Sequence, residues 1–381
     1  MNKKRRRGLR LFCWVGHPTR PYAELFYLEG CMFEKSTVIV VGAGASKEAG
    51  LPTGQELKTQ IVNLLDIKFD WREQKSGDVT ICEALRLHVK KTEPDLNDIN
   101  PHLRAARHIC DAMPQAISID NFIDAHSEDK KIELCGKLAI VRSILYAEKQ
   151  SLLYFDSVTM NRSQPDFKKL EGTWYNLFFQ LLTENCRKQD LLERAKRVVL
   201  IVFNYDRCIE HFIYHALQNY YKISPQEAGN IASAIKIYHP YGKVGALPWQ
   251  GAGGAVEFGT DPSAAQLLDF STQIKTFTEG TDPASSEIVS IRRNMLDSSI
   301  VVFLGFAFHR LNMRLIRPDS NGKSESKSFF ATARGISSSD CKQLESELGD
   351  FFVGESSSAN VRNDLTCFGL FQEYWRSLSF S

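Results

Sequence analysis

Short runs of β-branched and other apolar residues alternate along the chain with segments of helical periodicity. Thr37–Val41 is β-branched throughout, as is typical of a strand that is buried on both faces of a parallel sheet. A second apolar run covers Val198–Phe203. Strands that alternate with helices predict an α/β fold, a Rossmann-like doubly wound parallel sheet. Further short strands are predicted at Ile235–Tyr238, Ile300–Leu304, Phe329–Thr332 and Thr366–Phe368.

Helical periodicity dominates a long central part of the chain. Thr53 and Glu56 have the spacing of a capping box, and apolar residues follow on one face of a predicted helix. Farther along, strand-like runs disappear, and an apolar stripe at helical spacing begins at Trp174. The predicted parts are one domain over 32–381, its sheet portions 36–70 and 196–381, and a large α-helical insertion over about 70–195.

The first 31 residues form a basic segment of their own. Met32 directly precedes the first strong strand, so we expect residues 1–31 to be an accessory N-terminal extension. A basic run of this kind is either an arm that binds nucleic acid or a solvated terminus, and we favour the solvated terminus. The apolar stretch after it, Leu11–Val15, is shorter than the roughly 7–15 residues of a signal-peptide core, so export is not expected.

Composition and charge narrow the classes of function. Hydrophobic residues make up 43% of the chain and charged residues 24%, which excludes a disordered protein. A net charge of +2 provides no overall field for holding nucleic acid or an anionic membrane. The longest uncharged apolar stretches, Ser36–Ser46 and Ser298–Phe308, are shorter than the roughly 20 residues of a membrane-spanning helix.

The cysteines bear on both metal binding and cellular compartment. None of the nine forms a C-x-x-C pair, so we expect no zinc ribbon. An odd number scattered along so long a chain also argues against a disulfide framework and for a reducing, cytoplasmic setting. Free, buried thiols are the expectation.

A glycine-rich turn joins the first predicted strand to a short helix. Gly42 and Gly44 would let a phosphate approach the backbone, where N–H groups and a helix N-terminus favour an anion. Lys47 stands where a dinucleotide-binding fingerprint has its third glycine, and no lysine-serine pair of a nucleoside triphosphatase follows. The alternative is a tight turn that binds no ligand.

Three further groups of candidate residues directly follow predicted strands. Asn204 and Asp206 come after the second buried run, His239 after the third strand and Gly305 after the fourth. Because ligands bind at the carboxyl ends of strands in doubly wound sheets, we expect these residues at one edge. The alternatives are a helix N-cap at Asn204, a first-turn acid at Asp206 and a structural histidine at His239.

Taken together and in this order, these motifs resemble the sirtuin (silent information regulator) superfamily, in particular the sirtuin-like NAD-hydrolysing proteins of bacterial anti-phage defence. The resemblance covers about residues 36–370. Its most specific part is Val41–Ser46 followed by Gly50–Pro52, which is similar to the Gly-Ala-Gly-x-Ser…Gly-Ile-Pro opening of sirtuins.

The resemblance implies a role for each candidate residue. Asn204 would orient the nicotinamide ribose or the attacking water, and Asp206 would hold the nicotinamide amide. His239 would act on the ribose hydroxyls or on the water as general base, while the glycosidic bond breaks through an oxocarbenium-like state without a metal. Apart from the resemblance, Thr332 and Arg334 are candidates for contact with adenine because they lie at the end of the predicted strand Phe329–Thr332. The residues expected to bind NAD are Gly42, Ala43, Gly44, Ser46, Asn204, Asp206, Gly305, Phe306, Thr332 and Arg334.

Departures from the protein-deacylating sirtuins indicate the branch of the family. Those sirtuins carry a zinc module with two C-x-x-C pairs, which this chain lacks. Phe203 stands where they place Gln before the Asn, and Pro240 and Tyr241 separate His239 from the following glycine. We therefore expect no peptide groove, and water as the acceptor of ADP-ribose.

The resemblance thus implies an NAD glycohydrolase that releases nicotinamide and ADP-ribose and depletes NAD during infection. Within the defence family, a stand-alone sirtuin-like chain of this size resembles the proteins that are encoded together with a HerA-type hexameric ATPase. We accordingly expect a homo-oligomer that binds such an ATPase and meets nucleic acid only through it. The alternatives are an NAD-dependent protein deacylase and a non-catalytic module that binds NAD or ADP-ribose.

Overall fold

The computed structural model describes most of the chain from Ser36 onward. The basic extension expected over residues 1–31 lies outside the described residues. Within the described part, no helix has both the length and the apolar composition needed to cross a membrane. The described residues are 36–71, 73–95, 97–156, 163–251, 254–275, 277–280, 285–318, 326–351 and 357–379.

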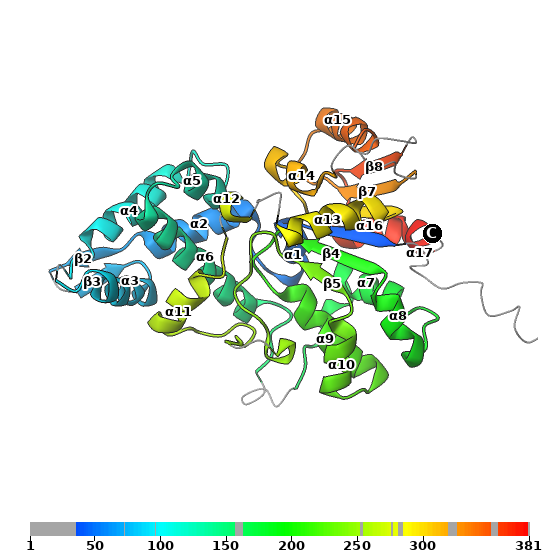
Figure 1. The fold of residues 1–381 in the computed structure, drawn as a ribbon, viewed down its shortest axis with the longest axis horizontal. Coiled ribbons are helices and arrows are strands. Elements are labelled where there is room, and N and C mark those ends of the chain that lie inside the picture. The colour runs from blue at the N-terminus through cyan, green and yellow to red at the C-terminus, as the bar shows by residue number, and fades with distance from the viewer. Residues whose placement is uncertain are drawn as a thin grey trace, which may run out of the picture.

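A six-stranded, wholly parallel sheet forms the centre of the structure (Figure 1). Its strand order is β5-β4-β1-β6-β7-β8, so the strands, numbered along the chain, are arranged 3-2-1-4-5-6. This is the doubly wound order of Rossmann folds, and the predicted fold class is confirmed. The winding reverses between β1 and β6. The strands are β1 (Thr37–Val41), β4 (Val198–Val202), β5 (Lys236–Tyr238), β6 (Ile300–Leu304), β7 (Ser328–Thr332) and β8 (Ser358–Arg362).

The sixth strand lies elsewhere than the sequence pattern indicates. The prediction of a strand over Thr366–Phe368 is wrong, because Thr366 is the N-cap of helix α16 (Cys367–Glu373) and its hydroxyl accepts a hydrogen bond from the Gly369 N–H at 3.0 Å. The sixth strand is β8, which pairs with β7 at the edge of the sheet. Its sequence, Ser-Ala-Asn-Val-Arg, is mostly polar and half-buried, so it has no apolar run to predict it.

Alternate residues of the strands pack into two hydrophobic cores, one on each face of the sheet. Val38 and Val40 belong to the core that includes α2 and α13, whereas Ile39 and Val41 belong to the core that includes α7, α9 and α16. Burial on both faces explains the unbroken apolar runs of the central strands. Of these helices, α2 spans Gly54–Leu65, α7 spans Trp174–Thr183, α9 spans Cys208–Tyr221 and α13 spans Ser286–Asp297.

A helical lobe lies beside the sheet and appears at the left of Figure 1. The large helical insertion is thus confirmed, but it also contains a short antiparallel hairpin, β2-β3, that the sequence pattern does not predict. Helix α11, from the C-terminal sheet portion, packs on α3 and α6 of the lobe. The lobe comprises β2 (Lys68–Asp70), β3 (Glu73–Ser76), α3 (Val79–Thr92), α4 (Asn100–Ala112), α5 (Ile119–Ala125), α6 (Lys130–Gln150) and α11 (Ala264–Ser271).

The last part of the expected insertion covers the sheet instead. The stripe that begins at Trp174 is buried against β1, β4 and β6, and the Trp174 ring stacks on Phe371 of α16 with 6.2 Å between ring centroids. Within the predicted insertion, only the helices before Trp174 therefore form a lobe apart from the sheet. The remaining helices are α1 (Ala43–Ser46), α8 (Leu191–Ala195), α10 (Pro225–Ala232), α12 (Phe277–Gly280), α14 (Arg310–Ile316), α15 (Ser338–Gly349) and α17 (Trp375–Ser379).

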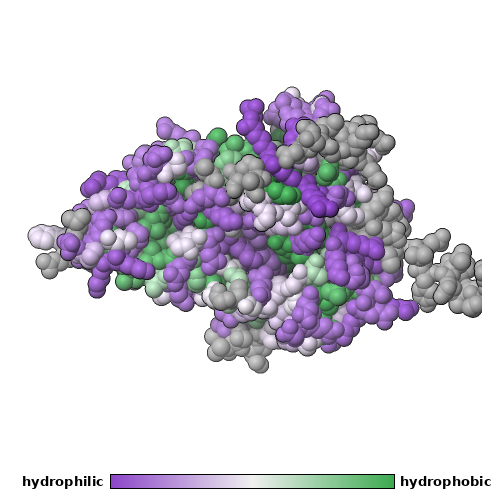
Figure 2. Space-filling model, viewed as in Figure 1, coloured by the Kyte–Doolittle hydropathy of each residue, from purple (hydrophilic) through white to green (hydrophobic). Residues whose placement is uncertain are grey.

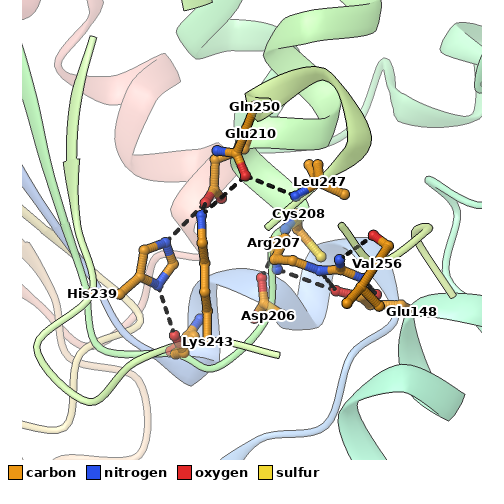
Figure 3. Close-up of polar contacts among 11 residues, drawn as sticks. Glu148, Asp206, Arg207, Cys208, Glu210, His239, Lys243, Leu247, Gln250 and Val256 are labelled. Atoms are coloured by element: carbon orange, nitrogen blue, oxygen red, sulfur yellow. Dashed lines mark hydrogen bonds and ion pairs between the residues drawn. The ribbon is translucent and has the colours of Figure 1, made fainter. Parts of the chain in front are cut away.

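A buried ion pair fastens the lobe to the sheet. Arg207, the N-cap of α9, and Glu148, near the end of α6, are both fully buried. The guanidinium donates from Nε to Oε1 at 3.0 Å and from Nη2 to Oε2 at 2.5 Å, a bidentate geometry seen in Figure 3. Arg207 also donates to the Val256 carbonyl, and the Gly259 N–H donates to Glu148. The pair thus joins α6, α9 and the 256–259 loop.

The face of the molecule seen in Figure 2 is mostly hydrophilic, with apolar side chains visible in small groups between polar ones. The most exposed apolar side chain among the described residues is that of Trp71, at the tip of the β2-β3 hairpin, which is 98% exposed. This surface is ordinary for a globular protein, whose folded surface always keeps a large apolar share.

Candidate functional site

A cavity of about 980 Å³ opens at the carboxyl edge of the sheet, where the winding reverses between β1 and β6. That is where doubly wound sheets bind ligands, and the volume is at the upper end for small-molecule sites. The turns after β1, β4, β6 and β7 form one wall, and α5, α12 and α14 contribute the others. The predicted site residues that line it are Gly42, Ala43, Gly44, Asn204, Gly305, Phe306, Thr332 and Arg334.

Two glycine turns pack directly on each other at the base of this cavity. The Gly42 N–H donates to the Leu304 carbonyl at 2.9 Å, and the Gly44 N–H to the Gly305 carbonyl at 3.0 Å. A Cβ on Gly42 would lie 2.5 Å from the Gly305 oxygen, and one on Gly305 would lie 2.0 Å from the Ala45 nitrogen. These glycines are therefore needed for contact between the turns, whether or not a ligand also approaches them.

We expect Gly305→Ala to destabilise the fold. Gly305 has φ +54°, and its added Cβ would meet backbone atoms that cannot move aside. The cost of a strained residue is about 1–3 kcal/mol, to which the clash adds. Chemical denaturation measures this loss. Gly172→Ala is the matched control, because a Cβ there meets no atom within 4 Å. Equal midpoints for the two variants would contradict the packing role.

Two hydrogen bonds from its nitrogen hold the side-chain amide of Asn204 in place and leave its oxygen free to accept a hydrogen bond. Its Nδ2 donates to the Gly42 carbonyl at 3.0 Å and to the Ser46 hydroxyl at 2.9 Å. Since a carbonyl oxygen only accepts, this bond determines which end of the amide faces Gly42. Within the described part of the chain Oδ1 has no hydrogen-bond partner, and Asn204 lines the cavity. A ligand hydroxyl or a water can donate to this oxygen.

Asp206 and Ser46 lie behind the cavity wall. The Ser46 hydroxyl donates to Asp206 Oδ2 at 2.8 Å, and the Cys208 N–H donates to Oδ1 at 3.1 Å. Both side chains are buried and neither lines the cavity. Burial raises the pKa of Asp206, although these hydrogen bonds oppose the rise. The carboxyl group thus supports Ser46 and the start of α9.

His239 also lies behind the wall, next to Asn204. Its Nδ1 is 3.2 Å from the Asn204 carbonyl oxygen and its Nε2 is 2.9 Å from Glu210 Oε1. Lys243 donates to the same Glu210 oxygen at 2.8 Å, and both side chains point at Glu210 in Figure 3. Since both partners of the ring are acceptors, the imidazole can donate from both nitrogens. His239 thus holds the backbone of Asn204, and both ring nitrogens are occupied.

Glu210 anchors this group and gives the fold a pH dependence. Burial favours its neutral form, but the charges of Lys243 and His239 outweigh burial and lower the pKa of Glu210 well below its usual range. Stability gained this way is complete above the unfolded-state value of about 4.3 and is lost as the pH falls below that value toward the folded one.

We expect Glu210→Gln to lose about 1.5–3 kcal/mol at neutral pH, the usual contribution of hydrogen bonds to a charged group. The variant should also lose stability less steeply than the parent below pH 4.3, about where an unfolded glutamate titrates. Denaturant unfolding at several pH values measures both effects. Glu227→Gln is the control, because Glu227 pairs with Lys188 at the surface. Parallel curves for Glu210→Gln and the parent would contradict this role.

Thr332 and Arg334 contribute to the cavity in different ways. The Thr332 hydroxyl is buried and accepts a hydrogen bond from the Gly305 N–H at 2.8 Å, so it supports the second glycine turn. Arg334 is exposed at the cavity wall, where its guanidinium is accessible to a ligand. The Phe306 side chain is buried and packs on Phe203 with 5.1 Å between ring centroids. The roles expected for adenine contact stay predictions.

Sequence reasoning missed the residues that the lobe and the later loops bring to the cavity. Asp120 of α5 lines it and accepts a hydrogen bond from the hydroxyl of Tyr205, the residue after Asn204. Tyr241 lines it too and donates to Asn312 Oδ1 at 2.5 Å. Burial raises the pKa of Asp120. No sequence motif singles out Asp120, since α5 lies within the insertion.

Comparisons with known proteins add no assignment. No family model matches the chain, and a search of curated proteins finds no match. In the described ranges, no group of three or more His, Cys, Asp or Glu side chains is arranged to hold a metal ion.

Proposed function

We propose that this protein is an NAD glycohydrolase that cleaves NAD to nicotinamide and ADP-ribose. The observation that carries the proposal is the presentation of Asn204. Asn204 lines a cavity of about 980 Å³ at the switch point of a Rossmann-type sheet, its amide nitrogen is bonded to the glycine turn, and its amide oxygen has no hydrogen-bond partner in the described part of the chain. An acceptor at this point suits a ribose hydroxyl or the attacking water.

Two arginines at the cavity, which also has acidic residues in its lining, support a substrate with phosphate groups. Lys47, Arg310 and Arg334 line it from three separate elements. Lys47 is paired with Glu56, whereas Arg310 and Arg334 are exposed to solvent. Arginine binds phosphate through paired N–H groups, so these two side chains are suited to a pyrophosphate or to a terminal phosphate.

The biological setting is part of the proposal and rests on the sirtuin-like motifs. Residues 36–370 resemble the sirtuin-like proteins of bacterial anti-phage defence, and in that setting the enzyme would deplete NAD. We propose that it acts as a cytoplasmic homo-oligomer with a HerA-type ATPase, which would control the activity. Contact with nucleic acid would then occur through the ATPase.

One observation favours a second candidate, a module that binds NAD or ADP-ribose without cleaving it. Asp206 and His239, which the resemblance implies to be catalytic, are hydrogen-bonded within the protein and do not line the cavity. In such a module these residues would only shape the binding site, and the occupied site would regulate the partner.

An assay of nicotinamide release separates the candidates. The purified chain is incubated with NAD and an acetylated peptide, with and without the co-purified ATPase, and the products are separated by chromatography. Free nicotinamide and ADP-ribose support the hydrolase. Transfer of the acetyl group to ADP-ribose would instead indicate a deacylase, and intact bound NAD would indicate a binding module.

A further inference from the structure

Asp120 lines the same cavity as the glycine turns, and its carboxyl group is the one best placed there to accept a proton. It lies on α5 of the helical lobe, whereas Asn204 follows β4, and both residues line the cavity. Tyr205 connects them, because it directly follows Asn204 and its hydroxyl donates to Asp120 Oδ1. We propose that Asp120 is the general base of the reaction, an inference that rests on the proposed NAD hydrolysis.

Three of the other acid and base candidates near the cavity are engaged elsewhere. Glu48 lines it, but its two oxygens accept hydrogen bonds from the N–H groups of Trp174 and Phe368 at 2.7 and 2.8 Å. Asp206 and His239 are bonded behind the wall. Asp120 has one oxygen held by Tyr205, and no other side chain of the described part of the chain donates to its carboxyl group. Since Asp120 lines the cavity, its carboxyl group can accept a proton from a water there.

The proposed step balances without a further reactant. The bond between the ribose C1′ and the nicotinamide nitrogen breaks, and its electron pair leaves with nicotinamide, which becomes neutral. Water forms the new bond to C1′ and gives one proton to Asp120, which passes it to solvent through the open cavity. A carboxylate that activates water against an oxocarbenium-like centre is the usual arrangement in inverting glycosidases.

The groups around Asp120 shift the pKa of its carboxyl group. Burial raises the pKa of the carboxyl group, while the Tyr205 hydroxyl and the positive charge of His309 oppose the rise. Asp124, one turn along the same helix, and Tyr241 also line the cavity. Burial raises the pKa of Tyr241, and the charges of both acids raise it further. A base whose pKa is raised toward neutrality is a stronger proton acceptor than an ordinary aspartate.

The test uses the full chain, with its ATPase if activity needs it, and follows nicotinamide release from NAD over a range of pH. We expect Asp120→Asn to lower the rate by about 10²–10⁴-fold, the usual contribution of a general base. Tyr205→Phe removes the donor that lowers the pKa of Asp120, so the acidic limb of its pH profile should move to higher pH. Asp269→Asn, the same change on the exposed side of α11, is the control.

Binding of ADP-ribose, measured by calorimetry, distinguishes a catalytic role from a structural one. We expect Asp120→Asn to bind ADP-ribose within a few-fold of the parent. If the parent releases nicotinamide and Asp120→Asn does so at the same rate with the same pH profile, Asp120 is not the base, and the proposed function stands. If the parent leaves NAD intact under every condition, the proposed function fails, and the role of Asp120 fails with it.

Discussion

Replacing Asn204 with alanine is expected to lower the rate of nicotinamide release by about 10²–10³-fold, the range for removing one preorganised polar contact to a transition state. Alanine removes the amide oxygen, which is proposed to accept from the ribose or water, and also frees the Gly42 carbonyl and the Ser46 hydroxyl from their shared donor. The first loss reduces alignment of the ribose or water, and the second loosens the glycine turn. Rates under single-turnover conditions measure the effect.

The conservative variant Asn204→Asp sharpens this test. Aspartate keeps an acceptor toward the cavity, but its second oxygen would face the Gly42 carbonyl, which also only accepts. We therefore expect no recovery of activity. Asn100→Ala, at an exposed position at the start of α4, is the control and should match the parent. A folded Asn204→Ala variant that releases nicotinamide at the parental rate would contradict the assignment.

Breaking the buried ion pair should give the largest loss of stability. Glu148→Ala and Arg207→Ala each leave one charge buried without its partner, which costs about 3–5 kcal/mol. Both groups are fully buried, and the guanidinium also binds two carbonyls of the 256–259 loop. Because the pair joins α6 to α9, we expect the contact between lobe and sheet to weaken first. Urea unfolding followed by circular dichroism measures the loss.

Two further variants identify the cause of this loss. The double variant Glu148→Leu, Arg207→Met removes both charges and keeps apolar volume, so it should be more stable than either alanine variant. Glu193→Gln breaks an exposed pair with Lys196 and should change stability by less than about 1 kcal/mol. Single variants as stable as Glu193→Gln would show that the buried pair does not hold the lobe.

The sequence determined most of the sheet because burial leaves a strong pattern. β1, β4 and β6 are buried along their whole length, and their unbroken apolar runs predict them almost to the residue. β8 is an edge strand with one buried residue, and so it carries no such pattern. At Thr366 a strand is predicted where a helix begins, because a short apolar segment after a threonine fits both a strand and a capped helix.

The candidate site was predictable only where it follows strands. Gly42, Asn204 and Gly305 come directly after buried strands, so the fold brings them together at one edge. Tertiary contacts alone place Asp120 there, because its helix is distant in sequence and belongs to the lobe. Sequence order also could not show that His239 faces Glu210, since that depends on the direction of the side chain.

Product stoichiometry tests the central claim most directly. The purified chain, alone and with the proposed HerA-type ATPase, is incubated with NAD, and the nicotinamide, ADP-ribose and remaining NAD are quantified together. The proposed function predicts that nicotinamide and ADP-ribose appear in equal amounts and that each amount equals the NAD consumed. NAD that binds the protein and is recovered intact under both conditions would contradict it.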